Sequence, residues 1–283
     1  MVSALRSPSS TPSAMKHYLA ELVRHRDLLF WLAAKEIKVR YKRPLLGVLW
    51  ALLVPLVSSL ILWFVFTYVL PMPPGQQPFF LFLIVGMFPW NFFAQSLTHS
   101  TTSVLDAGAL IRKTRFPRAL VPLSVVAANL FNFVLALAMV TGLVMAISRR
   151  ISPELWLLPL AVTLQLSLTI GMALLISSWQ VRFRDVKYLT ELGLVLWFYL
   201  TPVFYSLETI VRIPLLVRRL YLLNPCVGIL ELYRLALFGQ SSVSSSVLWS
   251  ITAIAGVWAV AILVVGLWIF RRQEPTLADF VTA

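Results

Sequence analysis

The chain has 283 residues, of which 59% are hydrophobic and only 12% are charged. Soluble domains carry about 25% charged residues, so the composition excludes an ordinary soluble domain and predicts a protein embedded in a membrane. The net charge of +13 could suit a nucleic acid, but the basic residues are spread over separate segments. We therefore expect membrane lipids, and no nucleic acid, among the partners of this chain.

The N-terminal part divides into two segments. Residues 1–15 are rich in serine and proline, a composition typical of disorder. Residues 16–43 are expected to form an amphipathic helix that lies in the membrane interface and ends before Pro44. Its cations should face lipid phosphates and a cytoplasmic partner, although a plain stop-transfer anchor is the alternative. These cations are Lys35, Lys38, Arg40, Lys42 and Arg43.

Six apolar segments with few or no charges follow, and together they predict a six-span membrane domain over residues 44–270. A span needs about 20 apolar residues to cross the hydrocarbon layer. The fifth segment in chain order is marginal by this measure, and the others meet it easily. The predicted spans cover residues 45–70, 79–103, 119–147, 155–180, 189–207 and 247–270.

The basic residues indicate the orientation of these spans. If the N-terminus is cytoplasmic, 18 of the 24 Lys and Arg lie on the cytoplasmic side and six on the outer side. Lys and Arg are enriched in the cytoplasmic loops of membrane proteins. We therefore expect a multi-pass protein with both termini in the cytoplasm, the C-terminal tail being residues 271–283.

The loop after the second span, residues 104–115, predicts a short cytoplasmic helix. Asp106 lies near its start, whereas basic residues lie near its end, an arrangement that suits the helix dipole. Such a helix can receive force from a motor subunit, while the alternative is an ordinary charged turn. The basic residues are Arg112, Lys113 and Arg115.

Residues 208–240 are largely apolar, but charges and prolines interrupt them. Glu231 and Arg234 would be costly in a span that faces lipid. We expect two short re-entrant helices on the outer side, hinged at Asn224 and Pro225. Irregular backbone at membrane depth is tolerated only inside protein or beside a water-filled cavity, so this pair of helices is expected to border a cavity.

Catalytic and metal-binding motifs are missing from the sequence. It contains no GxxxxGK[ST] phosphate-binding loop, no HExxH and no CxxC. The three histidines, His17, His25 and His99, are far apart and show no metal-ligand spacing. The chain is therefore expected not to be an enzyme and to hold no catalytic residue, metal or cofactor of its own.

Seven stretches between Trp31 and Val281 occur in the order in which a known family carries them. The chain thereby resembles the permease subunits of type-2 ABC exporters for lipid-linked polysaccharides, which include O-antigen, teichoic-acid and capsule exporters. Within that family, VRFRDV favours the O-antigen branch over the capsule branch. The stretches are IKVRYKRPLLGVLWALLVPL, GMFPWNFF, KTRFPRALVPLS, VRFRDVKY, LTPVFY, LLNPCVGILELYRLALFG and FRRQEPTLADFV.

The resemblance implies a function and partners. It implies a homodimer that moves an O-antigen-type glycan on a polyprenyl carrier across the cytoplasmic (inner) membrane of a bacterium. Two copies of a separate ATP-binding subunit would bind ATP and magnesium. The interfacial helix and the helix at 104–115, which corresponds to the family's coupling helix, would contact that subunit, and the re-entrant pair would lie at the periplasmic exit.

The candidate channel residues are aromatic, because flat apolar rings can pack against the C–H faces of sugars. Aromatic belts at membrane interfaces are the alternative explanation. Two other functions remain: a permease of the same fold for a drug or small lipid, and a membrane-bound acyl- or glycosyltransferase, against which the scattered acidic residues argue. The channel candidates in spans one and five are Trp63, Phe66, Tyr68, Trp197, Tyr199 and Tyr205.

Overall fold

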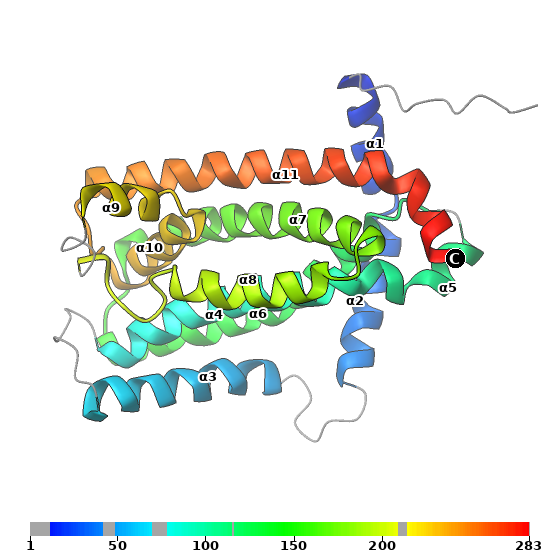
Figure 1. Cartoon of the computed structure of the whole chain (residues 1–283). Coiled ribbons are helices and arrows are strands. Elements are labelled where there is room, and N and C mark those ends of the chain that lie inside the picture. Colours follow the sequence, from blue (N-terminus) through cyan, green and yellow to red (C-terminus); the bar gives the residue numbers. More distant parts are fainter. Residues whose placement is uncertain (1–11, 42–48, 70–77, 115, 209–213, 283) are drawn as a thin grey trace, which may run out of the picture.

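The computed structural model describes residues 12–41, 49–69, 78–114, 116–208 and 214–282. Within these residues every regular element is a helix, which confirms the predicted all-α class (Figure 1). In chain order they are α1 (Pro12–Arg24), α2 (Arg26–Tyr41), α3 (Leu49–Phe64), the π-helical turn η1 (Val65–Val69), α4 (Phe79–Asp106), α5 (Gly108–Lys113), α6 (Leu120–Ser148), the 3-10 turn η2 (Pro153–Leu157), α7 (Leu158–Arg182), α8 (Val186–Tyr199), α9 (Leu215–Leu222), α10 (Pro225–Phe238) and α11 (Ser245–Thr282).

Five helical segments among the described residues are long and apolar enough to cross a membrane. They correspond to spans one to four and six of the prediction, and their ends differ from the predicted ends by a few residues in most cases. The exception is the last span, because α11 continues as one helix to Thr282. The predicted tail, residues 271–283, is therefore an extension of that helix as far as it is described.

The fifth predicted span, residues 189–207, is only partly helical. α8 has 14 residues and ends at Tyr199, and the chain then continues through turns. The helix stops there because Pro202 has no N–H for the helical ladder and disfavours helical backbone at Thr201. In Figure 1, α8 runs beside α4 and α7 toward the end of the bundle where α9 and α10 lie.

Helices α7 and α11 make the closest contact in the bundle, and glycine permits it. A Cβ atom built on Gly266 would lie 2.3 Å from the carbonyl oxygen of Gly171, and one on Gly171 would lie 2.5 Å from that of Ile262. Small residues allow membrane helices to approach in this way, since lipid provides no hydrophobic driving force between them. The last span is therefore fixed against the fourth, backbone to backbone.

Helix α4 lies inside the bundle, whereas α3 lies at its side (Figure 1). In the most hydrophobic stretch of α4, 72% of the residues are buried. In the corresponding stretch of the span that contains α3, only 11% are buried. α8 likewise turns large side chains outward, among them Leu192 and Tyr199. These outward apolar faces must be covered by lipid or by another protein chain.

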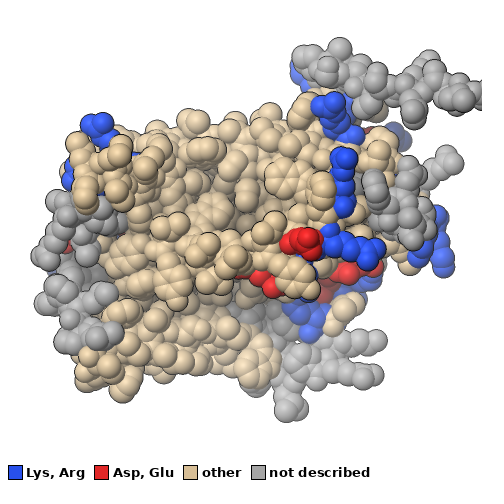
Figure 2. Space-filling view, viewed as in Figure 1, with Lys and Arg blue, Asp and Glu red and all other residues tan. Residues whose placement is uncertain are grey.

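Two helices, and not one, precede the first span. α1 begins at Pro12, inside the segment expected to be disordered, and the chain bends at His25 before α2. Both helices lie across the axis of the bundle at one end (Figure 1). Most charged side chains in view gather at this same end, beside a broad uncharged surface, while a smaller basic group lies at the opposite end (Figure 2). We call these the charged end and the far end.

Candidate functional site

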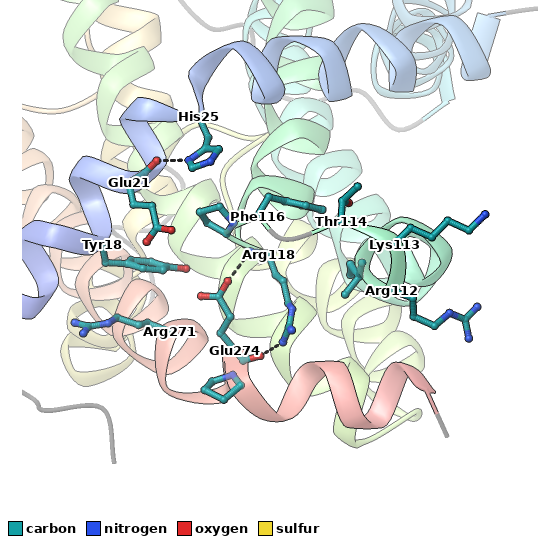
Figure 3. A pocket seen from close by; sticks show the side chains of 13 residues that line it. Tyr18, Glu21, His25, Arg112, Lys113, Thr114, Phe116, Arg118, Arg271 and Glu274 are labelled. Carbon is teal, nitrogen blue, oxygen red and sulfur yellow. Dashed lines mark hydrogen bonds between the residues drawn. The ribbon is translucent and has the colours of Figure 1, made fainter. Parts of the chain in front are cut away.

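A cavity of about 720 Å³ opens at the charged end of the bundle. Three separate parts of the chain surround it: α1, the connection from α5 to α6, and the end of α11 (Figure 3). Its lining carries more positive than negative charge. The charged residues are Arg112, Lys113, Arg118, Arg271, Glu21 and Glu274.

Glu274 joins two of these three parts. Its Oε1 accepts a hydrogen bond from the backbone N–H of Arg118 at 2.5 Å, and the Arg118 guanidinium donates to the Glu274 backbone carbonyl. Tyr18 of α1 lies beside this pair (Figure 3). Burial, and then the nearby Glu274 carboxylate, raise the pKa of Tyr18, so the phenol stays neutral. Helix α11 is thereby tied to the connection that follows α5.

The predicted helix at 104–115 is divided in two by the structure. α4 continues to Asp106, whose carboxylate accepts a hydrogen bond from the Thr102 hydroxyl at 2.7 Å, and α5 begins at Gly108. Asp106 therefore ends a span instead of starting the short helix, and the predicted dipole arrangement is wrong for this residue. Arg112 and Lys113 are exposed at the end of α5 and extend away from Glu274 (Figure 3).

The position of α5 is fixed by the burial of one of its side chains. Ile111 is buried in a small apolar cluster with Tyr18 of α1 and Phe270 of α11. The two basic residues that follow Ile111 therefore remain at the surface. Arg115 of the predicted set lies outside the described residues.

The cations of the expected interfacial helix divide into two groups. Lys35 and Lys38 are exposed, and their contact with lipid phosphates or a cytoplasmic partner stays a prediction. Arg40 instead turns into the bundle, where its Nη1 donates to Asn129 Oδ1 of α6 at 2.6 Å. Its role is therefore to attach α2 to the spans and not to meet lipid phosphates. Lys42 and Arg43 lie outside the described residues.

At the far end, α9 and α10 form the expected bent pair, with an angle of 75° between them. Asn224 is the hinge, as predicted, and its Oδ1 caps α10 by accepting from the Cys226 N–H at 3.0 Å. The same oxygen accepts from the Trp197 indole at 2.9 Å, and the Asn224 amide donates to the Leu200 carbonyl at 2.9 Å. The hinge is thus bonded directly to the end of α8. Pro225 occupies the first turn of α10, where its missing N–H is tolerated.

Glu231 and Arg234 of α10 form a buried ion pair with an N–O distance of 2.7 Å and exposures of 0% and 2%. The Arg234 guanidinium also donates to the carbonyl oxygens of Pro202 at 2.5 Å and Val203 at 3.1 Å. It lies 3.7 Å from the centre of the Phe82 ring. These two charges satisfy polar groups inside the protein, and the cavity that borders the pair of helices lies beside α9 instead.

Most of the aromatic channel candidates lie close to one another. Phe66 stacks on Phe204 with ring centres 5.9 Å apart, and the Tyr205 hydroxyl donates to the Tyr199 carbonyl at 2.9 Å. Trp63 contacts Tyr68 edge to face at 5.9 Å. The side chains of Tyr68 and Tyr199 are 65% and 61% exposed, so this cluster reaches the outer surface of the bundle.

Trp197 does not share this surface. Its ring packs edge to face on Phe93 of α4 at 5.2 Å, and its N–H is bonded to Asn224. A ring held in this way contributes to packing, although part of the side chain stays exposed, and contact with a sugar remains a prediction. The sequence predicted it as one of the aromatic residues of span five, but residues two apart on a helix do not share a face, so Trp197 and Tyr199 point to different sides.

Sequence reasoning missed the residues that tie elements together. Glu274 and Arg118 lie in two of the motif stretches, yet neither was a candidate. The signal for Glu274 was a carboxylate two residues after the Arg271–Arg272 pair and directly before Pro275. The signal for the break after α8 was Pro202 within an apolar run.

Comparison with known proteins adds a family and several relatives. Residues 27–238 match the family described as ABC-2 type transporter. The chain is 34% identical over 263 residues to the O-antigen export system permease protein RfbA of Myxococcus xanthus, covering 92% of this chain and 98% of that protein. Two proteins of the same name from Klebsiella pneumoniae are 35% and 36% identical over 198 and 200 residues, covering 69% of this chain and 74% of each relative.

Replacing Arg234 with Met tests the buried pair. The change leaves Glu231 without its cation and the Pro202 and Val203 carbonyls without their donor, so we expect a loss of about 3–5 kcal/mol in the free energy of unfolding. Arg218→Met on α9 is the matched control and should stay within about 0.5 kcal/mol of the parent. Thermal unfolding in detergent measures both, and equal stability of the two variants would refute the assigned role.

Replacing Glu274 with Ala tests the contact at the charged end. Hydrogen bonds to charged groups contribute about 1.5–3 kcal/mol, so amide hydrogen exchange at Arg118 and Ala119 should become roughly ten- to hundredfold faster. Glu274→Gln keeps an acceptor oxygen for the Arg118 N–H and should show a smaller increase. Exchange that is unchanged in Glu274→Ala would show that α11 does not hold this connection.

Proposed function

The chain belongs to the ABC-2 type transporter family, and we propose that it is the transmembrane subunit of an ATP-driven exporter of a lipid-linked polysaccharide. The cargo we propose is an O-antigen-type glycan on a polyprenyl carrier. The observation that carries this proposal is the similarity to an O-antigen export permease along nearly the full length of that protein. A similarity of this extent covers the charged end and the far end alike.

The orientation in the membrane follows from the charged end. Lys and Arg gather where α1, α2 and α5 lie (Figure 2), and such residues are enriched on the cytoplasmic side. We propose that this end faces the cytoplasm of a bacterial cell and that the re-entrant pair α9–α10 faces the periplasm. The chain then crosses the cytoplasmic membrane six times, α8 being the short fifth crossing.

A separate ATP-binding subunit is the partner we propose for the charged end, and it would carry ATP and magnesium. Arg112 and Lys113 are exposed on α5 beside the 720 Å³ cavity. A movement of α5 would reach α11 through the Arg118–Glu274 contact. The geometry therefore supports α5 as the element on which the ATP-binding subunit acts.

A second copy of this chain is the partner we propose for the exposed faces of α3 and α8. The end of α8 and the turns that follow α3 and α8 carry the aromatic cluster of Phe66, Phe204 and Tyr199, of which Tyr199 is exposed at the outside of the bundle. Two such faces opposite one another would enclose a channel with aromatic walls. Rings of this kind give large contact areas with sugars at little cost in conformational entropy.

Charge reversal on α5 tests the proposed partner. We expect the double variant Arg112→Glu and Lys113→Glu to reduce co-purification of the ATP-binding subunit at least tenfold, because repulsion between like charges at an interface costs several kcal/mol. The matched control is Arg218→Glu with Arg219→Glu, an adjacent basic pair on α9 at the far end. The amount of ATP-binding subunit per membrane subunit is measured after affinity purification from membranes.

The control pair should bind as much ATP-binding subunit as the parent. Equal binding by the α5 variant and the control would contradict the placement of the interface. ATP hydrolysis by the purified chain without any partner would contradict the proposal that a separate subunit hydrolyses ATP.

A further inference from the structure

A second cavity, of about 480 Å³, lies at the far end of the bundle between α9 and α11. Leucines of α9 line one side of it, and the first turns of α11 line the other. Leu216 and Leu220 are 71% and 62% exposed, so the described part of the chain does not cover them. We call this cavity the α9–α11 groove. Its volume lies within the range of about 300–1,000 Å³ that is usual for small-molecule sites.

The groove is apolar over most of its length and carries a positive charge at one place. Leu216, Leu220 and Leu223 supply an apolar wall, while Arg219 supplies the only charge among the described residues that line it. Among the residues described by the structure, no carboxylate lines the groove to neutralise Arg219. The Ser250 hydroxyl is already bonded to the Ser246 carbonyl at 2.8 Å. The groove therefore offers an apolar surface that ends at one uncompensated cation.

Helix α9 as a whole has the composition of an interfacial helix. Within eight residues it combines four leucines with Arg218 and Arg219. Such helices place their apolar side chains among acyl chains and their cations at the level of the lipid phosphates. Because Lys and Arg are disfavoured on the outer side of a membrane, two adjacent arginines there need a specific anionic neighbour.

We propose that the α9–α11 groove binds one anionic phospholipid of the outer leaflet, phosphatidylglycerol being the model ligand. Its acyl chain lies along the leucines of α9 and the start of α11, and its phosphate meets the Arg219 guanidinium. Arginine suits this role because its planar group forms paired hydrogen bonds with phosphate oxygens. The choice of leaflet rests on the orientation proposed above, whereas the site itself does not depend on the cargo.

Lipid binding is measured by native mass spectrometry of the full chain released from nanodiscs that contain equal amounts of phosphatidylglycerol and phosphatidylcholine. The parent should retain phosphatidylglycerol at least fivefold in excess over phosphatidylcholine. Arg219→Gln should reduce this excess to less than twofold. Arg218→Gln is the matched control, because Arg218 does not line the groove, and it should keep the excess of the parent.

A second variant tests the apolar part independently of charge. Ser250→Phe places a ring in the groove from an exposed position of α11, and it should lower retention of both lipids at least threefold. Equal losses in Arg219→Gln and Arg218→Gln would overturn the proposal in favour of general surface attraction. Preferred retention of an added polyprenyl phosphate would overturn the assignment to a phospholipid.

A second copy of the chain in the groove would also overturn the proposal. It would be detected as a disulfide between two copies carrying Ser250→Cys, and the lipid site predicts no such cross-link. The readouts require neither ATP nor glycan nor the ATP-binding subunit. A negative result here therefore leaves the proposed export function standing, and a failure of export would leave this lipid site standing.

Discussion

The arrangement of the far end depends on one interaction, the donation of hydrogen bonds by Arg234 to the carbonyls of Pro202 and Val203. Carbonyls freed by a break in a membrane helix have no water to bind, and each costs several kcal/mol if left unpaired. The guanidinium can satisfy them only from within the bundle, and Glu231 neutralises its charge there. Helix α10 must therefore lie inside the protein, and α9 turns away from it by 75° to reach the surface.

Helix α11 connects this end of the molecule to the other. Near its start it packs against α10, where a Cβ on Gly228 would lie 2.4 Å from the Ile251 carbonyl oxygen. In its middle it packs on α7 at Gly171 and Gly266, and at its end Glu274 holds the connection after α5. Close backbone contacts leave little freedom for the helix to slide or bend locally. A displacement of α5 by a partner is therefore expected to reach α9 and α10 through the part of α11 that precedes Pro275.

Features that depend on a long run of residues could be predicted from the sequence, whereas contacts between distant residues could not. Apolar runs of 20 or more residues revealed the spans, and the hinge at Asn224 could be predicted because proline is favoured in the first turn of a helix. Arg40 and Asp106 were assigned wrongly, since partners such as Asn129, 89 residues away, leave no local pattern. The buried pair at Glu231 and Arg234 was recognised as unusual, but its role depended on where α8 ends. Trp197 was predicted only as one of several aromatic residues in span five, and composition does not show that its indole bonds to Asn224.

The central claim is that this chain conducts a lipid-linked glycan under the control of a separate ATP-binding subunit. Proteoliposomes that contain both subunits, with their ATP-binding side outward, test it most directly. Lipid-linked O-antigen glycan is supplied with ATP, and the glycan that becomes protected from an added glycosidase is measured. The account predicts ATP-dependent protection of the glycan, and none with an ATP-binding subunit that cannot hydrolyse ATP. Transport of a small amphipathic drug without any protection of the glycan would contradict it.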